Sequence, residues 1–213
     1  MKIEPSLAVV QSLKEKPVYH ASELFELTGS RATAYRVLAR LRELGFASGT
    51  RRRGYFTIRS SAFQPYRLWP QLIPSLSALG AARRFGRSYD ESDVNFAQRS
   101  LAGMTTLDYR AYQLTGFQTP HTFFVYVERP DEGAELLKSN RFSEGRKGRV
   151  AVLSRDGGGF ENEIQRVYLD CLALGGRSTL DAIAIELLYG DRLAFKGEFP
   201  ADLVLKVREE LPR

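Results

Sequence analysis

Apolar residues recur at helical spacing over residues 30–44. Ala34, Leu38 and Leu41 follow one another at i, i+4 and i+7, which places them along one face of a helix. The serine that opens the segment can cap the first turn, and Gly45 is suited to the position just after the last turn. The pattern predicts an amphipathic helix with one buried stripe.

The same spacing places a polar and basic set of side chains on the other face of this helix. At about 100° per residue, Arg36 points most directly away from the apolar stripe. Its neighbours on that face are Ala32, Thr33, Tyr35 and Arg40. Arg31 lies nearer the buried side, but it belongs to the first turn. We therefore expect a basic outer face.

Short elements are expected on both sides of this helix. Before it, the pattern predicts a helix, a short strand and a second helix, over residues 5–13, 18–20 and 21–27. After it, residues 46–48 and 55–58 have the composition of strands. Between these strands, two glycines bracket a hairpin tip that contains Arg51, Arg52 and Arg53. Three adjacent arginines at a hairpin tip do not belong to a core.

This order of elements resembles a winged helix-turn-helix DNA-binding domain over roughly residues 5–59. The fold class expected for the whole chain is α+β: an N-terminal winged helix-turn-helix domain followed by a mixed α/β C-terminal domain. The expected limits are residues 1–60 for the first domain, 61–70 for a packed linker rich in aromatic residues, and 71–213 for the second.

The net charge is concentrated in the first of these parts. Residues 1–60 hold 11 Lys and Arg against 5 Asp and Glu, whereas residues 61–213 hold 20 of each. The whole formal charge of +6 therefore lies in the first quarter of the chain. A basic surplus confined to one module indicates that this module meets a polyanion.

The resemblance implies that the basic helix enters the major groove of double-stranded DNA. Thr33, Tyr35 and Arg36 are the candidates for contact at or near base edges. Arg31 and Arg40 are candidates for phosphate contact, and the three hairpin arginines would neutralise phosphates or enter the minor groove. The complete set of predicted DNA-binding residues is Ser30, Arg31, Thr33, Tyr35, Arg36, Arg40, Arg51, Arg52 and Arg53.

The C-terminal part has the pattern of alternating helices and strands. The predicted helices cover residues 72–85, 93–101, 161–174, 178–189 and 201–211, and the predicted strands cover 122–127 and 150–153. Ser92 is the expected cap of the second helix. Gly175 and Gly176 predict a tight corner between two helices. The basic stretch 138–149 is either a second phosphate-facing loop or a solvated one.

The stretch Leu169-Asp170-Cys171-Leu172-Ala173-Leu174-Gly175-Gly176-Arg177, following a winged helix, resembles the AbiE antitoxins of type IV toxin–antitoxin systems. The resemblance implies a repressor that binds repeats in its own promoter. It also implies a C-terminal domain that counteracts a nucleotidyltransferase-type toxin, often without stable contact. Two alternatives remain: a winged-helix regulator whose C-terminal domain binds a small effector, and a protein-interaction module.

The sequence offers little material for catalysis, and we expect no enzyme activity, cofactor or metal. None of the seven lysines has an acidic residue two positions before it, as a carboxylate-rich nuclease would need. His20 and His121 lie far apart. The glycine-rich stretch 156–159 does not complete a dinucleotide or P-loop motif. Asp108, Asp170, Asp181 and Glu186 are isolated carboxylates, for which capping or surface roles are expected.

The remaining sequence features concern the environment of the protein. The single cysteine, Cys171, lies among apolar residues at helical spacing, so we expect a buried and unreactive thiol. No apolar run approaches the length of a membrane span, and the first residues lack the apolar core of a signal peptide. We therefore expect a cytoplasmic protein without a membrane partner.

Overall fold

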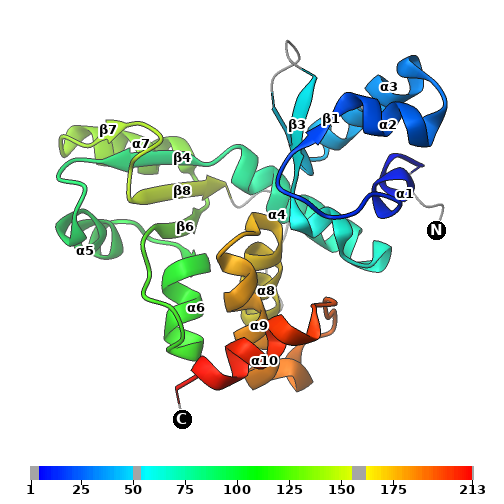
Figure 1. The fold of residues 1–213 in the computed structure, drawn as a ribbon. Helices are drawn as coiled ribbons and strands as arrows, with labels where there is room; N and C mark the ends of the chain where they lie inside the picture. Colours follow the sequence, from blue (N-terminus) through cyan, green and yellow to red (C-terminus); the bar gives the residue numbers. More distant parts are fainter. Residues whose placement is uncertain (1–4, 50–53, 155–161, 213) are drawn as a thin grey trace.

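The computed structural model describes residues 5–49, 54–154 and 162–212, and its fold is a mixture of helices and sheets (Figure 1). The described residues of the first part of the chain form three helices and three short strands. In chain order these are α1 (Pro5–Gln11), β1 (Tyr19–His20), α2 (Ala21–Thr28), α3 (Arg31–Glu43), β2 (Ala47–Ser48) and β3 (Tyr55–Ile58). All six elements expected from the sequence over this part are confirmed, with ends that differ by at most two residues.

The three short strands form an antiparallel sheet in the order β1-β3-β2. Tyr19 lies opposite Phe56, and Ala47 lies opposite Ile58. Along β3 the side chains alternate between exposed and buried, so that one side of the sheet faces the helices. The sheet therefore closes one side of the small core that α1, α2 and α3 share.

The segment after β3 is packed against the rest of the molecule. It forms two 3₁₀ turns, η2 (Ser60–Phe63) and η3 (Tyr66–Leu68), and continues into α4 (Trp69–Gly80). Trp69 is 4% exposed, and its ring meets the ring of Phe46 edge-on with centroids 6.4 Å apart. One cluster of buried residues continues from Val10 to Leu193. The N-terminal and C-terminal parts therefore share a hydrophobic core.

The C-terminal part is built around a five-stranded sheet with the strand order β5-β6-β8-β4-β7. Only the β6–β8 pair is parallel, and the other neighbours are antiparallel. The strands are β4 (Arg83–Gly86), β5 (Met104–Thr106), β6 (Phe123–Val127), β7 (Ser143–Glu144) and β8 (Val150–Ser154). All five residues of β6 are buried, as expected for a central strand covered on both faces.

Helices cover both faces of this sheet. Phe123, Val125 and Val127 face α5 and α7, whereas Phe124 and Tyr126 face the helices of the larger core. The helices of this part are α5 (Glu91–Ser100), α6 (Leu107–Thr115), α7 (Pro130–Ser139), α8 (Glu163–Leu174), α9 (Ser178–Tyr189) and α10 (Ala201–Glu210), with a 3₁₀ turn, η4 (Gly190–Arg192), after α9. Figure 1 shows α8, α9 and α10 gathered below the sheet, next to α6.

Several sequence expectations for the C-terminal part are wrong. The helix predicted over residues 72–85 ends at Gly80, and the chain continues as strand β4. Asp90, not Ser92, caps α5, because its carboxylate accepts from the backbone N–H of Ser92 at 2.9 Å. Helices α6 and α7 and strands β5 and β7 were not predicted. Strands β5 and β7 have only three and two residues, and α7 begins with a proline and contains Gly133.

The expected burial of Cys171 and the tight corner at Gly175 and Gly176 are confirmed. Cys171 is fully buried, and burial raises the pKa of its thiol. His20 lies at the start of α2, and His121 is exposed in a loop before β6. Gly175 and Gly176 have positive φ angles of 72° and 58° at the corner between α8 and α9. In the described part of the chain, no helix has the length and apolar character needed to cross a membrane.

Candidate nucleic-acid interface

Helix α3 is anchored in the small core by its predicted stripe. Ala34, Val37, Leu38 and Leu41 are all buried. Ser30 caps the helix, since its hydroxyl accepts from the backbone N–H of Thr33 at 3.5 Å. Gly45 follows the last turn with a φ of 79°, a left-handed conformation that favours glycine. The predicted stripe and both end residues are therefore confirmed.

The opposite face of α3 is open to solvent. Arg31, Ala32, Tyr35 and Arg36 are exposed, and Thr33 is half-buried between them. Tyr35 is 52% exposed although it is a large apolar side chain. Six of the nine predicted binding residues thus lie in or directly before one helix. Arg51, Arg52 and Arg53 lie outside the described residues.

Local contacts hold the exposed side chains of the first turns. The Nη2 of Arg36 donates to the hydroxyl of Thr33 at 3.3 Å, on the solvent side of the helix. The ring of Tyr35 meets the ring of Phe25 with centroids 5.6 Å apart, and the guanidinium of Arg31 lies 5.7 Å from the same ring. Phe25 of α2 therefore packs against two of the predicted contact residues, Tyr35 and Arg31.

The last turns of α3 carry one exposed ion pair. The guanidinium of Arg40 lies 2.8 Å from a carboxylate oxygen of Glu43, one turn further along. Their side chains are 39% and 68% exposed. Arg40 is half-buried, so it lies at the edge of the open face and not at its centre. This position suits contact with a phosphate better than contact with a base.

The contact between α3 and the hairpin is made by Arg42, which was not among the predicted binding residues. The Nη2 of Arg42 donates to the carbonyl oxygen of Gly49 at 3.2 Å, across seven residues. Gly49 itself passes so close to β3 that an added Cβ would lie 2.9 Å from the Cα of Phe56. The hairpin and the helix are therefore held together at this point. No period or motif indicated this role, because it depends on the path of the returning strand.

Helix α2 is held in place by a capping arrangement at its start. A carboxylate oxygen of Glu23 accepts from the backbone N–H of His20 at 2.7 Å, and the His20 ring accepts from the N–H of Ser22 at 3.3 Å. This backbone bond and the ion pair with Lys16 lower the pKa of Glu23. The turn after α2 passes through Gly29, with a φ of 65°. The turn sets the angle at which α3 leaves α2.

The isolated carboxylates of the C-terminal part each have a structural partner. Asp108 accepts from the backbone N–H of Thr122 at 3.1 Å, and Glu186 accepts from the hydroxyl of Tyr168 at 2.5 Å. Asp170 is fully buried and Asp181 is nearly so. Within the described ranges, no three His, Cys, Asp or Glu side chains lie close enough to hold a metal ion. The glycine-rich stretch 156–159 lies outside the described residues.

No family model, no curated protein and no solved structure matches this chain. The charge, exposure and contacts of the site itself therefore carry the functional argument. That site is an exposed basic helix face, attached to a hairpin and seated on a buried stripe.

Proposed function

We propose that the protein is a sequence-specific DNA-binding transcription regulator in which residues 5–59 form a winged helix-turn-helix module. The observation that supports this most is the exposed face of α3, where Arg31, Tyr35 and Arg36 project from the first two turns. The positive end of the helix dipole lies at the same end. A major groove has room for one helix presented in this way.

The roles of the side chains follow from their positions. Arg36 is exposed and is hydrogen-bonded to the half-buried Thr33 on the solvent side of the helix, so both residues present polar atoms toward base edges. Tyr35 presents an apolar ring with a hydroxyl, which suits contact with a thymine methyl or a phosphate. Arg40 contacts phosphate. The hairpin arginines contact the backbone or the minor groove on one side of the helix.

Autorepression and antitoxin activity are the finer part of the proposal, and the resemblance over residues 169–177 supports them. Six of these nine residues, Leu169 to Ala173 and Gly175, are buried in the structure. Any contact with a toxin or its substrate therefore falls to other surfaces of the C-terminal part. Co-expression with a neighbouring nucleotidyltransferase gene tests this role by the rescue of cell growth.

The test of DNA binding compares a duplex from the protein's own upstream region with a scrambled duplex of equal length, over a series of salt concentrations. We expect tighter binding to the upstream duplex. The Arg36→Ala variant should lose about 1–3 kcal/mol on that duplex and little on the scrambled one. The matched control is Arg208→Ala, which removes another exposed arginine, from α10.

Each outcome of this test has a defined meaning. Equal losses of affinity on both duplexes for Arg36→Ala would show that this residue does not contact base edges. Equal and steeply salt-dependent binding of the wild type to both duplexes would contradict autoregulation. The absence of binding would favour a protein-interaction module in place of a regulator.

A further inference from the structure

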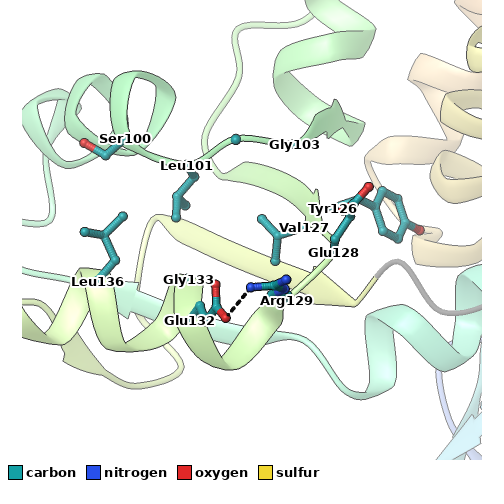
Figure 2. A pocket seen from close by; sticks show the side chains of 11 residues that line it. Ser100, Leu101, Gly103, Tyr126, Val127, Glu128, Arg129, Glu132, Gly133 and Leu136 are labelled. Carbon is teal, nitrogen blue, oxygen red and sulfur yellow. Dashed lines mark hydrogen bonds and ion pairs between the residues drawn. The ribbon is translucent and has the colours of Figure 1, made fainter.

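A cavity of about 660 Å³ lies on the side of the large sheet that faces away from α8. Its walls are the loop that follows α5, the end of strand β6 and the first two turns of α7 (Figure 2). The carboxyl end of a strand that has a parallel neighbour is a frequent position for ligands in α/β proteins. The volume falls within the range of small-molecule sites.

The loop after α5 lies firmly against β6. A Cβ added to Gly103 would lie 2.1 Å from the carbonyl oxygen of Tyr126, so only glycine allows the two backbones to come this close. One wall of the cavity is thus set by backbone packing. Sequence reasoning missed the cavity because its three walls come from separate segments of the chain.

The cavity combines an apolar surface with charges of both signs at its edge. In Figure 2 the side chains of Leu101, Val127 and Leu136 converge on one region. Near them the guanidinium of Arg129 lies 2.9 Å from a carboxylate oxygen of Glu132. Both of these side chains are largely exposed, at 76% and 69%.

A second carboxylate, that of Glu128, belongs to the same lining. Arg129 is also the residue directly before α7, and among the described residues its side chain makes no capping hydrogen bond to the N–H groups of the first turn. A ligand carboxylate is therefore attracted to Arg129 and the start of α7. A ligand ammonium group is attracted to Glu128 and Glu132.

We propose that this cavity binds a small zwitterion with an apolar side chain, of the α-amino-acid class. The carboxylate of the ligand meets Arg129, the ammonium group meets the two glutamates, and the apolar side chain lies against Leu101 and Val127. The ligand site is inferred from the geometry of the cavity alone. The role of the ligand in regulation rests on the proposed DNA-binding function.

A series of direct contacts connects this cavity with the N-terminal part. Tyr126 contributes its backbone to the cavity, while its ring points to the other face of the sheet, toward α8 (Figure 2). Its hydroxyl donates to buried Asp170 at 3.0 Å and accepts from Arg166 at 2.7 Å. At the end of the same helix, the carbonyl oxygens of Ala173 and Leu174 accept from Arg59 at 3.2 and 3.4 Å.

Arg59 directly follows strand β3, and its backbone N–H donates to the carbonyl oxygen of Phe46 at 2.8 Å. A ligand that displaces the end of β6 therefore acts on α8 through Tyr126, and on the hairpin of the N-terminal part through Arg59. Binding free energies coupled in this way are reciprocal, so a ligand that changes DNA affinity has its own affinity changed by DNA by the same factor.

The first experiment measures the melting temperature of the full chain with three probes of one shape. L-leucine carries both charged groups, 3-methylbutylamine lacks the carboxylate, and 4-methylpentanoate lacks the ammonium group. We expect only L-leucine to raise the melting temperature, by roughly 5–10 °C at a hundredfold excess over its Kd. Arg129→Gln and Glu128→Gln should each abolish this rise, whereas the exposed control Arg99→Gln should keep it.

Other results of this experiment overturn the proposed ligand class. An equal shift with 3-methylbutylamine means that the cavity takes a cation, and an equal shift with 4-methylpentanoate means that it takes an anion. No shift with any of the three probes overturns the site. Because Arg129 and Glu128 are exposed, their variants should melt at the wild-type temperature without ligand.

The second experiment measures the affinity for the upstream duplex with and without L-leucine. We expect a change of about fivefold or more in the wild type, and none in Tyr126→Phe, which lacks only the hydroxyl that contacts Asp170. A melting shift without any change in DNA affinity overturns the coupling but not the site. A melting shift in a protein that binds no DNA contradicts the proposed function and leaves the ligand site in place.

Discussion

Helices α3 and α8 are of similar length but occupy opposite environments. Four of the thirteen residues of α3 are buried, against eight of the twelve residues of α8. The polar side chains of α3 face solvent, whereas α8 carries a charged residue, Asp170, into the core. The first helix can meet an external partner directly. The second can influence function only through its neighbours in the protein.

The two helices also differ in what their polar side chains can contact. Arg31, Tyr35 and Arg36 on the outer face of α3 are exposed, so a partner can reach them. The Asp170 carboxylate accepts from Thr106 at 2.7 Å and from Tyr126 at 3.0 Å, and it lies 3.1 Å from Arg166. This buried cluster determines how α8 packs on the sheet. Burial raises the pKa of Asp170, against the opposing effect of Arg166 and the hydroxyls.

The largest effect on stability is expected from removing the buried carboxylate of Asp170. Asp170→Ala should lower the free energy of unfolding by roughly 3–5 kcal/mol, because Arg166 and two hydroxyls lose their acceptor inside the core. Urea denaturation measures the change. Arg36→Ala on the open face of α3 is the control, with an expected change within about 0.5 kcal/mol. Similar losses for the two variants would remove the contrast between the helices.

A large pH effect is expected at Asp181, which lies in α9 beside α8. Burial raises the pKa of this carboxyl from its ordinary value of 3.8 to about 7, while the amide of Gln118 donates to it at 3.0 Å. Between pH 4 and pH 7 the folded state therefore holds a proton that the unfolded state releases. Stability should fall as the pH rises through this window, by roughly 2–4 kcal/mol.

The Asp181→Asn variant tests this cause. It keeps an oxygen that can accept from Gln118 but carries no titratable group. Its free energy of unfolding should vary less than that of the wild type between pH 4 and pH 7, and should exceed it at pH 8. Parallel pH profiles for the two proteins would assign the pH dependence to other groups.

A moderate effect is expected from the hairpin arginines, which lie outside the described residues. Changing Arg51, Arg52 and Arg53 together to alanine should weaken binding to the upstream and scrambled duplexes alike. It should also reduce the slope of log affinity against log salt by up to about 3, since each phosphate contact contributes about 0.9. Circular dichroism serves as the control for folding. An unchanged slope would place these arginines away from DNA.

The smallest effect is expected at the exposed ion pair of α3. Glu43→Gln removes the partner 2.8 Å from Arg40, and the free energy of unfolding should change by less than about 0.5 kcal/mol. If α3 faces DNA as proposed, affinity for any duplex should rise by about twofold at low salt, because one negative charge leaves this helix. A loss of affinity would mean that Glu43 orients Arg40 for its contact.

The N-terminal elements could be predicted because local signals agree there. The apolar stripe of α3, its cap at Ser30 and its end at Gly45 all indicate the same helix, and the structure has it. In the C-terminal part the signals conflict. The apolar run after Leu72 has helical character up to Phe85, yet Arg83 to Phe85 pair with β8. Pairing between distant strands decided this segment, and a local pattern does not contain that information.

The candidate sites also contain features that the sequence predicts and features that it does not. The exposed face of α3 followed from its period, whereas the contact between Arg42 and Gly49 did not. The cavity beside α7 was not predictable, because Leu101, Val127 and Leu136 belong to three separate segments of the chain. Helix α7 itself begins with a proline and contains Gly133, which weakened its apparent helical character.

The close approach at Gly45 has a consequence for how this protein can be rearranged. A Cβ added there would lie 3.1 Å from the Cβ of Leu76 in α4, and the left-handed φ already disfavours other residues. Arg59 joins the same region to the end of α8. The first sixty residues are thus fitted to one particular neighbour. Exchange of this segment between proteins requires that α4 be exchanged with it.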